Sequence, residues 1–200
     1  MTLPNRARQT FLPSEIFFLA EDTPVDIIPR QSMKSIKVIG ESIPQLVPMR
    51  RTSVPLWVAI LLKKQGRCNI VSPDWLNEEN LKKVASDEAR HADRFSDLPW
   101  HWMEISQSLL AVAGDDIPSP TSLVRSLLKD IREARQAKAR AGLVELNESH
   151  MQMDNLGAME INEIRPFVGL VMDQMRRVRS LTEETGEENE DEIEDDNDEF

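Results

Sequence analysis

The sequence is poor in cysteine and lacks tyrosine altogether. Its one cysteine, Cys68, cannot form a disulfide within the chain, and this chain alone cannot supply a cysteine-based zinc site. Four tryptophans accompany the missing tyrosine. Because tryptophan concentrates in buried packing positions and at protein interfaces, we expect these four residues to act as packing anchors.

Long hydrophobic runs are absent as well. The opening residues, MTLPNRARQTFLPSE, contain no apolar stretch of the kind that directs secretion, so we expect no secretory signal. No run approaches the roughly 20 apolar residues that a membrane-spanning helix needs. The sequence therefore predicts a reduced, soluble, intracellular protein that does not associate with membranes.

Motifs for nucleotide binding and covalent catalysis are also missing. There is no phosphate-binding loop, no G-x-G-x-x-G and no G-x-S-x-G, and the seven glycines are scattered. Glu88-Ala-Arg-His91 is half of the motif that di-iron bundles place on a helix, but such bundles need a second copy, which the sequence lacks. We therefore expect no enzyme, no cofactor and no metal. An exposed charged helix explains the half motif better than a metal-dependent enzyme does.

The net charge of −11 comes from one segment. Residues 183–199 contain 12 acidic and no basic side chains, which leaves 23 acidic against 24 basic residues elsewhere. Repulsion between these carboxylates and the scarcity of apolar residues predict a disordered acidic tail over 183–200. Such a tail can serve solubility, or it can attract a basic partner such as a histone or an arginine-rich loop.

Short β-like runs dominate the first third of the chain. Residues 1–14 have no periodicity and are interpreted as a flexible extension, and 15–21 can form a turn or two of helix. Several runs rich in β-branched residues are bounded by proline or glycine, which is typical of short strands. These runs are 25–29, 35–40 and 67–71. The sequence thus predicts a small β-rich domain over 15–71.

The segment 55–65 is predicted to be a helix that joins this domain to the rest. Pro55 suits a helix start, two lysines favour the C-terminal turn, and Gly66 suits a left-handed cap. The helix is apolar on every face, so it either lies between two layers or fills the core of one domain. Trp57, Ile60 and Leu61 are its expected anchors, with Trp75 closing the junction.

The remaining chain predicts an α-helical domain over 72–182, with about five helices. Their predicted ranges are 77–95, 102–113, 122–149, 153–162 and 167–181. In the longest of them, one apolar face is expected, formed by Leu123, Leu127, Ile131 and Ala134. Pro166 is expected to start a fresh helix. After it, the spacing of Val168, Val171, Met175 and Val178 predicts a seam for a neighbouring helix.

The longest predicted helix is also rich in basic residues. They are Arg125, Lys129, Arg132, Arg135, Lys138 and Arg140. A basic stripe can follow the phosphates of a nucleic acid. A solvated face, or a rim for acidic neighbours, is the commoner meaning of such a stripe and is the interpretation that we favour.

Several motifs follow one another in a recognisable order. They are FLAE (18–21), DIIP (26–29), the strand end around 37–40, VPLWVAILLKKQGRCNIVSPDWL (54–76) and MDNLGAMEIN (153–162). Together they resemble the family of GINS complex subunit 2, the second of the "partner of Sld five" subunits. The most specific part is PLW followed by an apolar helix, a cysteine strand and P-D-W. The resemblance covers about residues 18–181.

The resemblance implies an α+β fold with a small N-terminal β-rich domain followed by a predominantly α-helical bundle domain. It also implies a non-catalytic scaffold in a heterotetramer with three sister GINS subunits. That complex binds the MCM helicase ring and its RecJ-like partner to form the active replicative helicase, and it connects the helicase to the replicative polymerase. The implied location is the nucleus, and direct DNA contact is not required.

Ten apolar residues are the candidate core or partner-interface anchors. They are Trp57, Ile60, Leu61, Trp75, Leu156, Met159, Val168, Val171, Met175 and Val178. The alternative to a scaffold subunit is a free-standing, acidic-tailed adaptor that binds histones or nucleic acid. Under that alternative the acidic tail and the basic helix act together.

Overall fold

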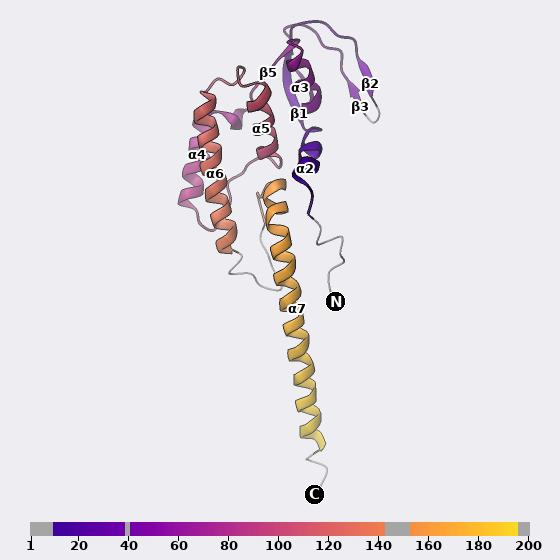
Figure 1. Cartoon of the computed structure of the whole chain (residues 1–200), viewed down its shortest axis with the longest axis vertical. Helices are drawn as coiled ribbons and strands as arrows, with labels where there is room; N and C mark the ends of the chain where they lie inside the picture. The colour runs from indigo at the N-terminus through magenta and orange to yellow at the C-terminus, as the bar shows by residue number, and fades with distance from the viewer. Residues whose placement is uncertain (1–9, 39–40, 143–152, 196–200) are drawn as a thin grey trace.

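A computed structural model describes residues 10–38, 41–142 and 153–195, and the side chains of 10–38, 42–142 and 153–181. The helices are α2 (Pro13–Ala20), α3 (Leu56–Lys64), α4 (Glu78–Arg90), α5 (Trp102–Val112), α6 (Thr121–Gly142) and α7 (Ala158–Asp195). The strands are β1 (Pro24–Pro29), β2 (Ile36–Val38), β3 (Glu41–Ile43), β4 (Thr52–Pro55) and β5 (Cys68–Ile70), and η1 (Asp74–Leu76) is a short 3-10 helix. The strands come first and most of the helices follow, as predicted, and α7 extends well beyond the other elements (Figure 1).

Three antiparallel strands in the order β4-β1-β5 form the main sheet. In the central strand β1, Val25 and Ile27 are buried and alternate with more exposed residues, which is the pattern of a strand with one face on the core. Val25 pairs with Val54, and Ile27 pairs with Ile70. Prolines occupy both ends of β1, where a missing N–H costs little pairing.

Helix α3 lies between this sheet and α5, which is the first of the two positions that the sequence allows. The helix ends where expected. Gly66, which follows the C-cap residue Gln65, has a φ of 68°, and this left-handed conformation terminates the helix. Its buried residues are Leu56, Val58, Ala59 and Leu62. Leu61, by contrast, is 49% exposed, so the helix is not enclosed on every face.

The single thiol is fully enclosed beside α3. Cys68 is 0% exposed, and its Sγ lies 3.7 Å from the carbonyl oxygen of Ala59. Burial is the main reason that its pKa rises to about 11, with the nearby carboxylate of Asp116 adding to the effect. The thiol is therefore a packing group, and its thiolate is strongly disfavoured.

Strands β2 and β3 form a separate two-stranded hairpin that projects from the sheet (Figure 1). Ile36 and Val38 are 45% and 41% exposed, so the alternation of apolar residues in β2 does not bury one face. The loop that follows β3 returns to the core through Ile43 and Leu46, which are both buried. A hairpin of this size has little stability of its own and relies on these attachments.

Helix α4 begins as predicted and ends five residues earlier than the predicted 95. The Asn77 side chain accepts a hydrogen bond from the backbone N–H of Asn80 at 2.8 Å, which caps the helix. His91 adopts extended backbone angles. The Glu88 carboxylate accepts hydrogen bonds from the N–H and Oγ of Ser96, at 3.0 and 2.5 Å, so the chain turns back toward the helix instead of extending it.

In α6 the buried face is displaced from the predicted one. The predicted face was Leu123, Leu127, Ile131 and Ala134, whereas the buried residues are Val124, Leu128, Ile131 and Arg135. The displacement arises because an arginine completes the inward-facing stripe, and a search for apolar residues passes over it. Residues 143–149 of the predicted helix lie outside the described residues.

The predicted break at Pro166 is wrong, because α7 runs through it as one helix. Pro166 is exposed, so water can replace the hydrogen bond that proline cannot donate. The helix starts at Ala158, not near 153, and the N–H of Gly157 just before it donates to Oε2 of Glu160 at 2.7 Å. The described part thus has four helices after the sheet, not the expected five.

The backbone of α7 continues to Asp195, through part of the segment for which the sequence predicts disorder. Extending an existing helix avoids the cost of nucleation, and glutamate has a favourable helix propensity, so acidic composition alone does not stop a helix. Residues 196–200 of the predicted tail lie outside the described residues.

Replacement of Trp102 and of Trp57 should show how much each side chain contributes to the core. Trp102 is 2% exposed, whereas Trp57 is only partly buried against the core. Trp102→Ala is expected to lower the free energy of unfolding by about 3–5 kcal/mol, and Trp57→Ala by about half as much. Urea unfolding followed by circular dichroism measures both. Equal losses would contradict this assignment of the more enclosed side chain.

Candidate protein–protein interface

Exposed apolar side chains gather on α2, on the segment before it, on α7 and just before α5. They are Phe11, Leu12, Phe18, Leu19, Trp100, Phe167, Leu170, Val178 and Leu181, each between 50% and 73% exposed. In α2 only Ile16 and Ala20 face the core, although nearly the whole helix is apolar. Soluble monomers rarely expose so many large apolar residues in one region, so this surface is a candidate interface.

A groove of about 670 Å³ separates α2 from α7. Its lining includes Phe11, Leu19, Trp100, Ile161 and Val168, and it is predominantly apolar. The segment before α2 is fixed to α7 by a pair of hydrogen bonds. The N–H of Phe11 donates to Oδ1 of Asn162 at 2.8 Å, and Nδ2 of Asn162 donates to the Phe11 carbonyl at 3.0 Å. One wall of the groove is therefore held to the other.

A second groove, of about 600 Å³, lies between α2, α5 and α6. Phe17, Met103 and Leu110 supply apolar lining, and Arg125 and Arg132 stand among its polar residues. Arg132 is paired with Glu163 of α7 at 2.6 Å. Helix α2 thus stands between two open grooves, and it contacts α5 and α7 through only a small part of its surface.

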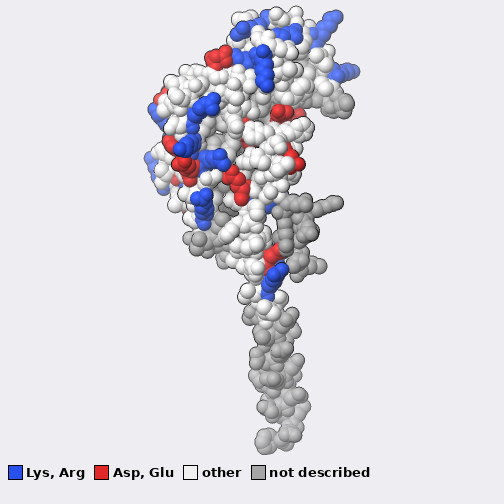
Figure 2. Space-filling view, in the orientation of Figure 1, with Lys and Arg blue, Asp and Glu red and all other residues white. Residues whose placement is uncertain are grey.

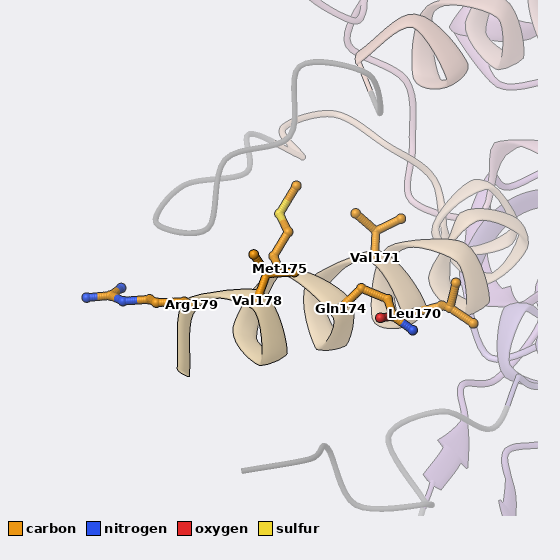
Figure 3. A pocket seen from close by; sticks show the side chains of 6 residues that line it. All are labelled: Leu170, Val171, Gln174, Met175, Val178 and Arg179. Atoms are coloured by element: carbon orange, nitrogen blue, oxygen red, sulfur yellow. The ribbon is translucent and has the colours of Figure 1, made fainter. Parts of the chain in front are cut away.

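The part of α7 that follows the first groove carries an apolar strip, which continues from that groove along the helix. Leu170, Val171, Met175 and Val178 line a shallow recess of about 410 Å³ along the helix. Figure 3 shows Val171 and Met175 projecting from the same side of the ribbon. Val168, Val171 and Met175 are partly exposed and Val178 is 63% exposed, so the predicted seam faces outward in this chain.

A buried ion-pair network holds the helices that carry this surface. Arg135 of α6 is 1% exposed; its Nη1 donates to Oε1 of Glu88 at 2.7 Å, and its Nε donates to Oε1 of Glu160 at 2.7 Å. Lys138 also binds the Glu88 carboxylate. One guanidinium therefore connects α4, α6 and α7.

The same guanidinium also fixes backbone and aromatic groups. Its Nη2 donates to the Asn155 carbonyl at 2.6 Å, and its Nη1 donates to the Ser96 carbonyl at 3.1 Å. The carbon at its centre lies 5.0 Å from the ring centre of Phe95 and 6.0 Å from that of Trp102. Arginine suits this site because its planar fork offers five donors at once.

Protonation of the network follows from these contacts. Burial opposes the ionised form of Glu88, but hydrogen bonds from Lys138 and Ser96 outweigh it and lower the Glu88 pKa. Burial likewise opposes the charge of Arg135, and the two carboxylates outweigh it and raise the Arg135 pKa. Both shifts favour the charged forms of Glu88 and Arg135, and these two opposite charges lie against each other.

A second buried carboxyl, Glu104, has no such compensation. It is 1% exposed, and neither of its side-chain oxygens has a hydrogen-bond partner among the described residues. Burial raises its pKa, its own backbone N–H opposes the rise, and the charge of Glu160 adds to it. Nδ1 of His101 lies 3.8 Å away, and burial lowers the His101 pKa. Both shifts favour the uncharged forms.

Glu88, the first residue of the half motif Glu88-Ala-Arg-His91, belongs to the buried ion-pair network around Arg135. Glu88 is 2% exposed and accepts from Arg135 and Lys138, so the expectation of an exposed charged helix is wrong for this residue. His91 lies beside Arg94, with 3.1 Å between Nε2 and Nη2. Within 10–38, 41–142 and 153–195, no group of three or more histidine, cysteine or acidic residues is placed to hold a metal. No helix in those ranges is long and apolar enough to cross a membrane.

The ten predicted anchor residues occupy different surroundings. Trp57, Ile60 and Trp75 are partly buried against the core, and Leu61 is exposed next to them. Leu156 is 5% exposed, and Met159 lines the second groove. The anchors on α7 lie along the outward strip. The structure therefore does not bring the ten residues together into one site.

Sequence reasoning missed the residues that matter most for this surface. Arg135 was interpreted as part of a basic stripe that forms a solvated face or a rim for acidic neighbours, and not as a buried residue, and Glu160 received no role. A signal was present, since Arg135 follows Val124, Leu128 and Ile131 at helical spacing. A charged residue on an apolar face predicts a buried partner of opposite charge.

Two family models match consecutive parts of the chain. Residues 12–71 match the PSF2 N-terminal domain, and residues 75–179 match the GINS complex protein helical bundle domain. The matched ranges meet at η1, between the sheet and the helices. The fold and its interface surface therefore define a protein of the GINS helical-bundle class.

Comparison with curated relatives identifies the family within this class. The DNA replication complex GINS protein PSF2 of Candida albicans is 49% identical over 183 residues, which is 92% of this chain and 90% of the relative. The protein of the same name from Debaryomyces hansenii is 48% identical, over 89% of this chain and 86% of the relative. The protein of the same name from Saccharomyces cerevisiae is 40% identical, over 96% of this chain and 98% of the relative. The chain belongs to the PSF2 family of DNA replication complex GINS proteins, which confirms the resemblance found in its sequence.

Removal of the central guanidinium should destabilise the helical part strongly. Arg135→Ala is expected to lower the free energy of unfolding by about 3–5 kcal/mol, because it removes the cation beside the buried Glu160 and one of the two cations beside Glu88. Arg132→Ala, on the exposed side of the same helix, is the matched control and should cost less than about 1 kcal/mol. Urea unfolding at neutral pH measures both. Similar losses for the two variants would contradict the proposed role of Arg135.

The stabilising effects of Glu88 and Glu104 should depend on pH in opposite directions. The lowered pKa of Glu88 adds stability that is present above pH 4.5 and is lost as the pH falls through the folded-state value. The raised pKa of Glu104 favours folding below pH 4.5, and this contribution is lost as the pH rises through the folded-state value.

Glu104→Gln should therefore stabilise the protein at pH 8 by about 1–3 kcal/mol and have a much smaller effect at pH 4.5, because the amide carries no charge to bury. Thermal unfolding across this pH range measures the difference. A stabilisation that does not change with pH would contradict this account of Glu104.

Proposed function

We propose that this chain is a non-catalytic scaffold subunit of a heterotetramer that it forms with three sister GINS subunits. The observation that carries the proposal is the apolar surface shared by α2 and α7, which the chain leaves uncovered. Membership of a family whose members are named DNA replication complex GINS proteins supports it. The work of the chain is then binding, and no residue has a catalytic role.

The shape of the surface favours helical partners. The groove between α2 and α7 has apolar walls, which suits the apolar side of an amphipathic helix. Along α7, Val168, Val171, Met175 and Val178 are spaced by three, four and three residues, which is the spacing of a helix-packing seam. A helix that packs against α7 and inserts side chains into the groove would cover both features together.

The wider role that we propose is in the initiation and elongation of DNA replication in the nucleus. There the heterotetramer acts with the MCM helicase ring and its RecJ-like partner, and it contacts the replicative polymerase indirectly. The family's association with DNA replication supports this role. Direct contact of this chain with DNA is not needed for it.

An acidic-tailed adaptor for histones or nucleic acid is the competing function. It requires residues 183–200 for partner binding, whereas the scaffold requires the α2 and α7 surface. Deletion of 183–200 should leave the subunit composition of the complex unchanged if the chain is a scaffold. Loss of all partners on that deletion would favour the adaptor.

Charge introduced into the apolar surface should prevent assembly. The full chain is co-expressed with the three sister subunits, and native mass spectrometry measures the complex. Phe18→Glu with Leu170→Glu should reduce recovery of the complete complex at least about tenfold, because a carboxylate is costly to bury at an interface. Ser126→Glu, on an exposed part of α6 that lines neither groove, is the control and should assemble normally.

The isolated chain provides the second half of this test. With its apolar surface uncovered, it should associate or aggregate, and the sister subunits should restore a single species. A stable, monodisperse monomer that ignores the other subunits would overturn the proposal. So would normal assembly of the Phe18→Glu, Leu170→Glu variant.

A further inference from the structure

Charge is distributed very unevenly among the parts of the chain. Residues 24–71 contain eight basic and two acidic residues, a balance of +6. Residues 72–182 contain 14 basic and 18 acidic residues, a balance of −4. The part of the chain that forms the sheet and hairpin is thus the positive part, although the chain as a whole carries −11.

The fold brings several of these basic residues to one end of the sheet. The backbone N–H of Arg30 donates to the carbonyl of Arg67 at 2.8 Å, and the N–H of Met49 donates to the carbonyl of Pro29 at 3.0 Å. Arg50 follows directly, so residues from three parts of the sequence meet where β1 ends. We give the name basic end to these residues together with the lysines next to or within β2 and at the end of α3. The basic end comprises Arg30, Lys34, Lys37, Arg50, Lys64 and Arg67.

Two basic residues near the basic end, Arg51 and Lys63, form ion pairs with aspartates. Arg51 is paired with Asp26 at 2.7 Å, and Lys63 is paired with Asp115 and Asp116 at 2.7 and 2.8 Å. Among the described side chains, no residue of the basic end has an ion-pair partner. Its most constrained member, Arg30, donates from Nε and Nη2 to the Asn69 amide oxygen at 3.1 and 2.6 Å, so its hydrogen bonds go to a neutral group.

Figure 2 shows lysine and arginine side chains gathered over this end of the molecule, with few acidic ones between them. Apolar side chains are exposed among them. Met49, which has a φ of 62°, is 84% exposed, and Ile36 and Val38 of the hairpin are 45% and 41% exposed. The surface therefore offers positive charge and aliphatic contact together, next to a hairpin that no further strand covers in the described structure.

We propose that the basic end binds an extended acidic segment of a partner protein that also carries aliphatic side chains. Carboxylates would pair with the unpaired lysines and arginines, and aliphatic residues would cover Ile36, Val38 and Met49. The open edges of the hairpin allow such a segment to add main-chain hydrogen bonds. This surface is separate from the apolar α2 and α7 surface, so it would serve a partner other than the one that packs there.

A protein segment fits this surface better than a nucleic acid does. Phosphates would use the positive charge but would gain nothing from the exposed aliphatic residues. Single-stranded nucleic acid stacks its bases on aromatic side chains, and Trp57 is the only aromatic residue in 24–71 and is already partly buried against the core. Salt dependence is common to both kinds of partner, so peptide and DNA probes are needed to distinguish them.

The test measures binding to the full-length chain by fluorescence anisotropy at 150 mM salt. The probe is a fluorescein-labelled 14-residue peptide in which glutamate and isoleucine alternate between serine-rich ends. The triple variant Lys34→Glu, Lys37→Glu, Arg67→Glu should weaken binding by about tenfold or more, because it replaces attraction by repulsion at three points. Ile36→Ser with Val38→Ser should also weaken binding, without any change of charge.

The matched control is Lys83→Glu, Arg90→Glu, Arg140→Glu, which changes the net charge equally on exposed positions of α4 and α6. It should bind the peptide like the parent chain, and circular dichroism should show all variants folded. Equal weakening by the control would reduce the effect to net charge and overturn the proposal. Tighter binding of a 20-base-pair duplex DNA than of the peptide would also overturn it. Neither result bears on assembly through α2 and α7.

Discussion

The organisation of the helical part depends on one buried guanidinium. Arg135 holds Glu88 of α4 and Glu160 of α7 while it donates to the backbone that connects these helices. Ion pairs of this kind add little net stability compared with apolar packing, but they strongly disfavour arrangements that leave one partner alone. The network therefore fixes where α7 starts and in which direction it leaves the body. The exposed strip on α7 is positioned as a consequence.

The same helix combines a buried beginning and an exposed continuation. Glu160 is 5% exposed and belongs to the network, whereas Leu170, further along the same helix, is 62% exposed. Together with α2, which is apolar on nearly all sides, α7 presents large side chains that the chain itself does not cover. The exposed surface is thus already shaped in the single chain, on helices whose buried sides belong to the same fold.

Much of this architecture is predictable from the sequence because local signals agree with the fold. The β-branched runs, the cap at Asn77 and the left-handed Gly66 identify their elements correctly. The errors arise where the surroundings of a residue in the fold, and not its local sequence, decide its role. Apolar patterning passed over Arg135 on α6, and the local rule for Pro166 did not include an exposed position where water replaces its missing donor. Tertiary pairing partners of this kind do not appear in a single sequence.

The seclusion of Cys68 has a practical consequence for spectroscopy. Its sulfur is 0% exposed, and its pKa of about 11 keeps it protonated, so thiol-directed reagents will find almost no thiolate to modify. A cysteine introduced at the surface would therefore be labelled selectively without first removing the native one. Paired labels on the hairpin and on α7 would report the distance between these two projecting elements in solution.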